Sequence, residues 1–534
     1  MERAISFLGL LVLMGLAYVF SVHRKSINFR TIAWGVGLQL TFAVIILSEG
    51  TRSFLGMCVL ASLILLYVTH YDFQERAGGL VRLGAIVLPL AAALVFASYH
   101  LAKMGVTIVL LVVALLTVAI TTKLGDGKTS RLSFAAVVVF GLGHFWANGF
   151  DGQVIFSVLS DKVAAFLALS NLGAEFLFEN LARGQYFGPQ DGWPGFGFQF
   201  AFTVLPTIIF FSAFMSVMYY LGIVQVFISA MAKFMHWTMR TSGSETMSCS
   251  ANVFVGQTEA PFLVKPFLDK MTNSELHAIM VGGFATIAGG VLAGYIQMGV
   301  DPGHLIAASV MSAPAALVIA KLLYPETEHS VTAGDVEIPK IETADNIVGA
   351  AANGTTDGLK LALNVGAMLI AFIALIGFVD MVLGYFDALI DGQWLGRSIA
   401  EGGTEYDGFV PGSLKTVFAT IFAPLAFVMG VPWADAGAVG NLLGIKMTVN
   451  EFVSYGVLSE HINAGDLSPR SIVIATYALC GFANFSSIGI QIGGIGAIAP
   501  EVRPKLAKIG VRAMFGGALA SFMTATIAGI LVAV

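Results

Sequence analysis

Charge is scarce in this sequence: Asp, Glu, Lys and Arg make up 11% of the 534 residues, and the formal net charge is -5. Soluble domains carry about 25% charged residues, so this composition excludes an ordinary soluble protein. The basic residues lie in short, separate loops, which excludes the dense positive patch of a nucleic-acid-binding protein. Hydrophobic residues make up 57% of the chain and the mean hydropathy is +0.84. We therefore predict a protein that crosses the lipid bilayer many times.

Cysteine is also rare, and metal motifs are missing. The three cysteines Cys58, Cys249 and Cys480 lie far apart in apolar sequence, so we expect small packing residues rather than disulfides or metal ligands. The sequence has no HExxH motif, and no two of its nine histidines stand four residues apart. Since no cluster of nucleophiles or metal ligands appears, we expect neither an enzyme nor a bound cofactor.

Long apolar runs are abundant. A helix that crosses the hydrocarbon core needs about 20 apolar residues. We predict about 12 such spans, at residues 4–20, 31–48, 54–70, 83–98, 104–121, 133–149, 201–222, 275–298, 304–323, 358–386, 469–498 and 509–533. Basic residues recur in alternate loops, which predicts that these loops are cytoplasmic and that both termini lie on the outer side of the membrane. Residues 151–182 mix charged with apolar residues, as is typical of helices that lie at the membrane surface.

Two stretches, 241–268 and 434–460, are too polar for a span and too apolar for a loop. We predict that they are re-entrant hairpins, which exist at membrane depth only inside protein or beside water. The spans 275–298 and 469–498 that follow them are interrupted by glycines. Each half of the chain repeats the order span, amphipathic stretch, hairpin and interrupted span, and the loop charges place the two hairpins on opposite sides. The sequence therefore predicts an all-α polytopic membrane protein with an inverted repeat and a binding site near the midplane.

This order divides the chain into seven segments. We predict peripheral helices at 1–50, inserted spans at 51–149, outer-surface helices at 150–200, a first repeat at 201–323, a cytoplasmic linker at 324–353, a second repeat at 354–498 and a final helix at 499–534. For the insertion at 51–149 we favour peripheral packing or subunit contact over a regulatory surface.

Carboxylates stand at the turns of both predicted hairpins. Glu259 has no Lys or Arg beside it, and an unpaired carboxylate at membrane depth costs several kcal/mol, so we favour a functional role. Glu451 lies five residues after Lys446, which leaves a structural salt bridge open. For the hydroxyls of Thr286, Ser486 and Ser487, a bond back to their own helix is as plausible as a role in binding.

Several motifs together resemble the concentrative nucleoside transporter family. They are Arg24-Lys-Ser-Ile-Asn28, Gly243-Ser-Glu245, the run Ala251 to Pro261, Ala285-Thr-Ile-Ala-Gly289, Ser312-Ala-Pro-Ala315, Pro325-Glu-Thr327, Asn450-Glu451-Phe452 and Cys480 to Ser487. The resemblance covers about residues 1–50 and 150–534. It implies a homotrimer whose protomers each take up nucleosides, of the uridine, cytidine and adenosine class, driven by a cation gradient.

The resemblance also implies residue roles. The nucleobase would meet Gln257 and Thr258, with Val291 and Phe482 as apolar walls. The ribose would meet Glu259, Glu451, Asn484 and Ser487. A sodium ion would be held by the Asn252 side chain, the Val255 and Ile287 carbonyls and the Thr286 hydroxyl.

Several alternatives stay open at this point. Sodium is our preferred coupling ion, while a proton remains the alternative because a buried carboxylate can titrate. The residues do not decide between purine and pyrimidine nucleosides. A membrane-embedded enzyme and a nucleoside sensor are remote alternatives. The resemblance implies a location in the plasma membrane, as in the inner membrane of a bacterium.

Overall fold

The computed structural model describes residues 2–69, 113–115, 117, 127–189, 193–332, 344–396 and 410–532. All elements in these ranges are helical. Eight helices among them are long and apolar enough to cross a membrane, or nine if the bent pair α16 (Leu414–Met429) and α17 (Trp433–Thr448) counts as one. The predicted span 83–98 and most of 104–121 lie outside the described residues, so the count of about 12 stays a prediction.

The chain forms two compact units, of which the smaller comprises Leu40–Leu159. Within it α3 (Thr51–Thr69) packs against α6 (Gly127–Ala147). Their contact is an apolar cluster of Ala61, Leu65, Val139 and Leu142. The described residues of the predicted insertion at 51–149 all belong to this unit.

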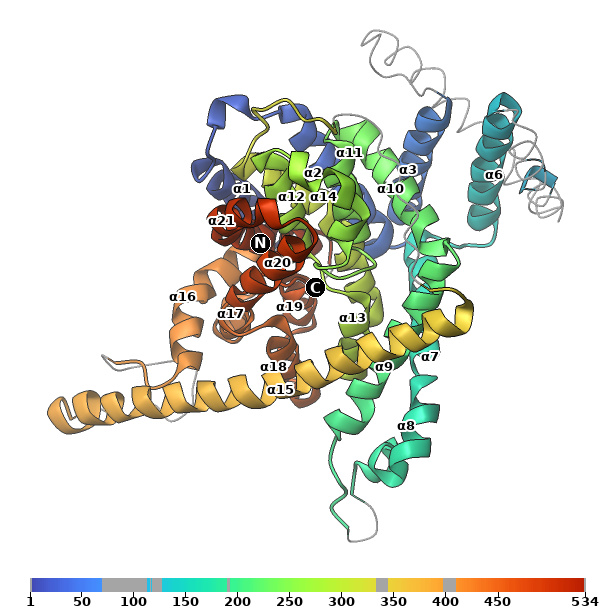
Figure 1. The fold of residues 1–534 in the computed structure, drawn as a ribbon. Helices are drawn as coiled ribbons and strands as arrows, with labels where there is room; N and C mark the ends of the chain where they lie inside the picture. Colours follow the sequence, from blue (N-terminus) through green and yellow to red (C-terminus); the bar gives the residue numbers. More distant parts are fainter. Residues whose placement is uncertain are drawn as a thin grey trace. The chain divides into compact units, whose positions relative to one another are not determined.

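The larger unit comprises Met1–Gln39 and Ser160–Val534 and is built around α21 (Arg503–Leu531). This helix packs against α1 (Glu2–Val19), α12 (Asn273–Ala285), α14 (Pro302–Leu323) and α19 (Pro469–Leu479). Small residues on α21 permit the close approach: a Cβ added at Gly517 would lie 2.2 Å from the Cβ of Phe284. The core therefore brings helices from all three thirds of the sequence together (Figure 1).

Two helical pairs coincide with the predicted hairpins. The first runs from α11 (Gly243–Ala251) through a turn into the 3₁₀ helix η4 (Ala260–Lys270), and the second from α17 into α18 (Glu451–Ala464). Ser242 and Glu245 form a capping box that begins α11, and Asn450 caps α18 through its Oδ1. Caps of this kind satisfy the amides that the first helical turn leaves free. Re-entry of these pairs into a membrane stays a prediction.

Both predicted interruptions are present. Residues 286–288 separate α12 from α13 (Gly289–Gln297), and residues 480–484 separate α19 from α20 (Phe485–Ile498). The two breaks contact each other directly, because the Phe482 amide donates to the Thr286 carbonyl at 3.2 Å. Gly481 has a φ of +150°, and a Cβ there would lie 2.7 Å from the Phe284 carbonyl oxygen. Glycine is required at this crossing because only glycine adopts such a φ freely.

The second repeat begins with a helix longer than predicted. α15 (Ile347–Asp387) has 41 residues, so at about 1.5 Å per residue it is about 60 Å long. It begins inside the segment predicted as linker, because the Asn346 side chain caps it by accepting from the Gly349 amide. α15 packs along α9 (Phe200–Tyr220), as Figure 1 shows.

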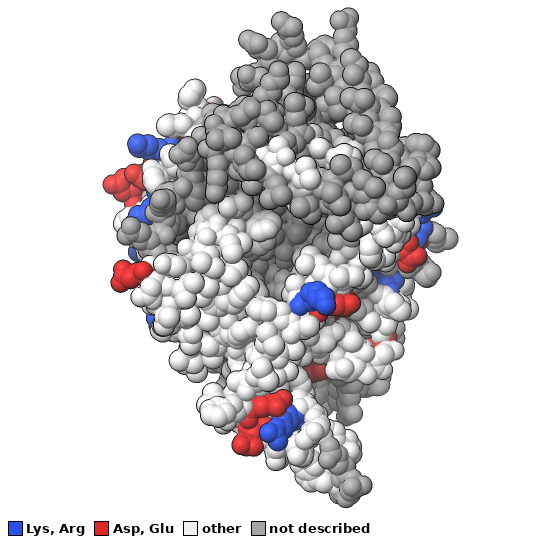
Figure 2. Space-filling model, turned by 90° about the vertical axis from the view of Figure 1, so that its right-hand side faces the viewer, with Lys and Arg blue, Asp and Glu red and all other residues white. Residues whose placement is uncertain are grey.

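The remaining helices follow the predicted order. They are α2 (Phe29–Leu47), α7 (Gly152–Leu167), α8 (Ser170–Phe178) and α10 (Ile223–Met239). Residues Gly152–Tyr186, predicted to lie at the membrane surface, are long and apolar enough to cross, so their surface location stays a prediction. Many large apolar side chains are exposed, including Ile370, Met381 and Tyr385 of α15. Figure 2 shows one face on which charged residues occupy a few separate places and most described atoms belong to uncharged residues.

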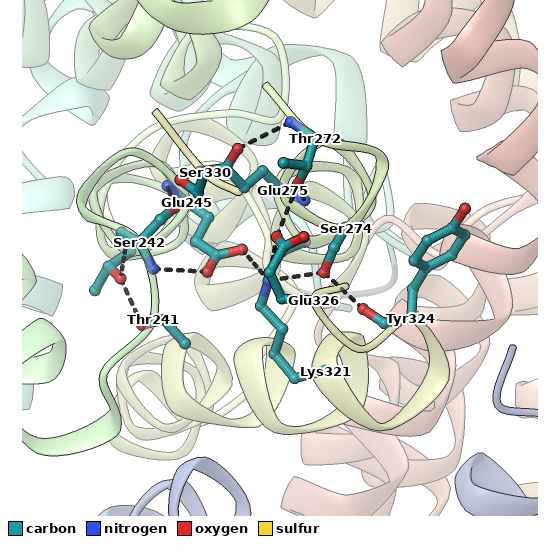
Figure 3. Close-up of polar contacts among 12 residues, drawn as sticks. Thr241, Ser242, Glu245, Thr272, Ser274, Glu275, Lys321, Tyr324, Glu326 and Ser330 are labelled. Carbon is teal, nitrogen blue, oxygen red and sulfur yellow. Dashed lines mark hydrogen bonds and ion pairs between the residues drawn. The ribbon is translucent and has the colours of Figure 1, made fainter. Parts of the chain in front are cut away.

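A buried polar cluster ties the first hairpin to its neighbours (Figure 3). Lys321 of α14 forms an ion pair with Glu245 of α11 at 2.6 Å and donates to Ser274 of α12 at 2.8 Å. Glu275 caps α12 and also accepts from the Ser330 hydroxyl at 2.6 Å. Since buried charges are costly unless paired, these contacts hold α11, α12, α14 and the segment after α14 together.

Candidate functional site

A cavity of about 200 Å³ lies where the two repeats meet. Its lining comes from the tip of the first hairpin, from both interrupted helices, from the start of α18 and from α15. All eight residues that the sequence nominated for the substrate line it: Gln257, Thr258, Glu259, Val291, Glu451, Phe482, Asn484 and Ser487. Residues separated by up to 230 positions thus share one cavity, although the structure assigns them no ligand.

The carboxylate of Glu451 is the buried charge of this cavity. It is 4% exposed and accepts hydrogen bonds from the Tyr295 hydroxyl at 3.1 Å and from Asn484 Nδ2 at 3.2 Å. Tyr295 is itself fully buried and stacks on Tyr455, with ring centroids 4.2 Å apart. Sequence reasoning missed Tyr295, because its register relative to Glu451 depends on how α13 packs against α18.

Lys446 does not form the salt bridge that its spacing left open. Its buried Nζ donates to the Ala478 carbonyl at 2.7 Å and lies 5.5 Å from the centroid of the Phe522 ring. Ala478 belongs to the last turn of α19, where free carbonyls create negative potential. Lys446 therefore stabilises a helix end, and Glu451 keeps its oxygens toward Tyr295, Asn484 and the cavity.

The break before α20 presents two further polar groups. Asn484 caps α20: its Oδ1 accepts from the Ser487 amide at 2.8 Å and from the Ser486 hydroxyl at 2.7 Å. This leaves Nδ2 to donate to Glu451. The Ser487 hydroxyl accepts from Gln257 Nε2 at 3.4 Å, so Ser487 is bonded across the cavity, while Ser486 is bonded within its own turn.

The two carboxylates of the hairpins differ in environment. Glu259 is exposed, unlike the buried Glu451, although both line the cavity. Its carboxylate lies back over Gly256, where an added Cβ would be 2.2 Å from Oε2. Glu259 therefore lines the cavity with an exposed side chain, and its location at membrane depth stays a prediction.

The apolar lining is wider than the sequence predicted. Val291 and Phe482 line the cavity together with Leu361, Val365, Met368 and Leu369 of α15. The α15 residues recur at helical spacing, the signal of one helix face. Helical spacing shows that these residues share a face of α15, and only packing places that face beside the cavity.

The proposed cation ligands lie around the first break. Asn252, Val255, Thr286 and Ile287 are all buried. Asn252 Nδ2 donates to the Ser248 carbonyl at 3.0 Å, while its Oδ1 has no hydrogen-bond partner among the described residues. A Cβ added at Gly282 would lie 3.3 Å from Asn252 Nδ2, which places this side chain against the end of α12.

These oxygens suit an alkali cation. The Thr286 hydroxyl donates to the Gly282 carbonyl at 3.0 Å, so its lone pairs stay free. In the described part of the chain, the Val255 and Ile287 carbonyls accept no hydrogen bond. Buried acceptors without a partner are rare because each costs about 1–3 kcal/mol. A bound cation would satisfy them. Ser248, one turn before Asn252, has an unpaired buried hydroxyl as well and was missed by sequence reasoning.

Broken helices that cross at a polar cavity between two repeats define the class: this is a multi-pass membrane transporter. Three family models match the chain. They are the Na+ dependent nucleoside transporter N-terminus at residues 8–64, nucleoside recognition at 201–301, and the Na+ dependent nucleoside transporter C-terminus at 304–529. Residues 65–200, which include most of the predicted insertion, lie outside these matches.

Relatives and solved structures agree with these matches. An uncharacterised transporter of Haemophilus influenzae is 44% identical over 71% of this chain and 86% of its own length. Sodium/nucleoside cotransporter 1 of Mus musculus is 40% identical over 75% of this chain and 59% of its own length. The structure of CNTnw in an inward-facing, substrate-bound state has a TM-score of 0.72 at 32% identity and covers 99% of this chain and 98% of that one. The chain belongs to the concentrative nucleoside transporter family.

Proposed function

We propose that this protein is a sodium-coupled nucleoside symporter that imports nucleosides by alternating access. The observation that carries the proposal is the meeting of all eight nominated substrate residues in one cavity at the crossing of the two interrupted helices. Nucleosides combine an apolar base face with a hydroxyl-rich sugar, and the cavity combines an apolar wall with a buried carboxylate. The mammalian sodium/nucleoside cotransporters support the same assignment.

In this proposal each polar group has a distinct role. Ribose hydroxyls donate to Glu451 and Glu259, because hydrogen bonds to a carboxylate are about twice as strong as neutral ones. Asn484 and Ser487 complete the ribose subsite. Gln257 and Thr258 meet the polar edge of the base, while Val291 and Phe482 contact its faces.

Sodium acts on the hairpin tip. Asn252 and Val255 precede Gln257 by only a few residues in the same turn, and Thr286 and Ile287 lie in the break that packs against it. A cation held by these four residues orders the segment that contacts the base. Its binding free energy is thereby linked to that of the nucleoside, and the linkage is reciprocal.

The remaining architecture follows the sequence-based assignment. The hairpins 241–268 and 434–460 and the two interrupted helices form the transport domain of each protomer, and three protomers assemble into a homotrimer. The segments at 1–50, 51–149, 150–200 and 499–534 surround it, and 324–353 connects the repeats on the cytoplasmic side. The protein resides in the plasma membrane with both termini outside.

Uptake into proteoliposomes tests the proposal. Purified protein is reconstituted into proteoliposomes, and radiolabelled uridine or adenosine is added to the outside medium under an inward sodium gradient at fixed pH. Saturable accumulation is expected, and replacement of sodium by choline is expected to abolish it. Equal uptake in choline that disappears when a proton gradient is collapsed would refute sodium coupling in favour of protons. Binding without accumulation would refute transport.

A further inference from the structure

Gln491 of α20 lies behind the cavity, where three segments meet at its amide. The side chain is fully buried. Its Nε2 donates both to the Met280 carbonyl of α12 at 3.1 Å and to Oε1 of Gln257 at 3.0 Å. Its Oε1 has no partner among the described residues. An unpaired buried acceptor destabilises a fold, so an apolar residue at position 491 would favour stability. The presence of an amide there indicates that it has a function.

The direction of both amides follows from the Met280 carbonyl. A backbone carbonyl can only accept, so Gln491 must direct its NH₂ group toward it. The same NH₂ group faces Gln257, which must therefore turn its own carbonyl oxygen toward Gln491. The Gln257 NH₂ group is left to point at Ser487 and the cavity. Reversing either amide would place two acceptors or two donors face to face.

Gly283 makes this arrangement possible. A Cβ added there would lie 2.7 Å from Gln491 Nε2 and 2.9 Å from Gln257 Cβ. The two glutamines thus pass across the face of α12 at a position where no larger residue fits. The contact is specific packing around the amide pair, not a chance approach of two flexible side chains.

We propose that Gln491 is a positioning residue that holds Gln257 as a hydrogen-bond donor toward the ligand. The proposal rests on the proposed function, in which Ser487 meets the ribose. A donor beside Ser487 then meets the base atom next to the glycosidic bond. That atom is O2 in pyrimidine nucleosides and N3 in purine nucleosides, and both are acceptors. The site therefore binds both classes of nucleoside through one shared acceptor.

Ligand analogues test this donor directly. Binding of adenosine, 3-deazaadenosine and 7-deazaadenosine to the purified full chain is measured by calorimetry in sodium buffer. The 3-deaza analogue has a C–H group in place of N3, and the 7-deaza analogue changes the far edge of the base. For the wild type we expect 3-deazaadenosine to bind about 3- to 10-fold more weakly than adenosine, because it loses one hydrogen bond to Gln257. Removal of N7 should change affinity less than twofold.

Variants then test the role of Gln491. In Gln491→Met the amide of Gln257 is free to turn. The ratio of the affinity for adenosine to the affinity for 3-deazaadenosine should therefore fall below twofold. Gln491→Glu, which keeps the shape, should do the same because a carboxyl group holds at most one proton and cannot donate to both partners. Gln39→Met is the matched control. Gln39 is also buried, and its Nε2 donates to the Met311 carbonyl at 3.1 Å and to Thr524 Oγ1 at 3.2 Å. Its Oε1 has no partner in the part of the chain that the structure describes, but the residue does not line the cavity.

The possible results distinguish a failure of this inference from a failure of the proposed function. A ratio that persists in both Gln491 variants, or that falls equally in Gln39→Met, overturns the positioning role. A wild-type affinity ratio near one shows that the donor does not meet N3 and overturns the shared-acceptor inference, while nucleoside binding itself leaves the proposed function standing. A wild type that binds no nucleoside overturns the proposed function and this inference together.

Discussion

Replacing Glu451 by glutamine isolates the charge of the cavity from its shape. The carboxylate accepts from the Tyr295 hydroxyl and from Asn484 Nδ2. In Glu451→Gln the new oxygen can still accept from Asn484, which only donates there, while the new NH₂ group faces the Tyr295 hydroxyl. A hydroxyl can turn to accept, so the local hydrogen bonds survive. What the variant loses is negative charge toward the cavity.

The expected loss follows from the strength of the bonds to ribose. Hydrogen bonds to a charged group contribute about 1.5–3 kcal/mol and neutral ones about 0.5–1.5. Each ribose hydroxyl bonded to Glu451 therefore loses about 1–1.5 kcal/mol. Two hydroxyls lose about 2–3 kcal/mol, which lowers kcat/KM for uptake by about 30- to 150-fold.

The assay is initial-rate uridine uptake into proteoliposomes under a fixed sodium gradient, with 2′-deoxyuridine as the second substrate. The wild type should prefer uridine, because a site built for the hydroxyl leaves its acceptor unpaired when the hydroxyl is missing. That preference should collapse in Glu451→Gln. Glu460→Gln is the control, since Glu460 is exposed on the same helix and outside the cavity. Wild-type uptake by Glu451→Gln with an unchanged uridine preference would refute the ribose assignment.

Three further changes have distinct expected results. Asn252→Leu removes a buried oxygen that has no hydrogen-bond partner among the described residues. The sodium concentration for half-maximal uptake should therefore rise at least about fivefold, without loss of thermal stability in sodium-free buffer. An unchanged sodium dependence would contradict the cation assignment. Gly283→Ala forces Gln257 and Gln491 apart and should weaken nucleoside binding measured by calorimetry. Gly456→Ala, whose added Cβ meets no described atom within 4 Å, should not weaken it. Lys321→Met leaves the buried carboxylate of Glu245 on α11 without its ion-pair partner. The free energy of unfolding should fall by about 3–5 kcal/mol, which is measured as a large fall in Tm. Lys360→Met removes an exposed ion pair and should leave Tm nearly unchanged.

Much of this fold could be predicted from local patterns in the sequence. Apolar runs of bilayer length predicted the helices, and polar interruptions at 241–268 and 434–460 predicted the paired helices α11–η4 and α17–α18. Glycine clusters predicted the breaks at 286–288 and 480–484. These features depend on neighbouring residues alone, since caps, glycines and helix lengths act within one or two turns.

What only the tertiary structure decided is how distant groups face each other. The sequence left Lys446 free to pair with Glu451, and packing of α17 against α19 directed it to the Ala478 carbonyl instead. The sequence did not show which of Glu259 and Glu451 is buried, and the fold exposes the first and buries the second.

Tyr295 and Gln491 show the same limit of sequence reasoning. In the sequence they look like ordinary residues of apolar helices. The packing of α13 against α18 makes Tyr295 a partner of Glu451, and the packing of α20 against the first hairpin makes Gln491 a partner of Gln257. The physical reason is that helix patterns specify which residues share a face, whereas hydrogen bonds depend on the register and distance between faces. The sequence by itself therefore determined most of the helices and both helix breaks, and its resemblance to a family nominated eight residues that line the cavity. The tertiary structure decided which polar atoms meet there.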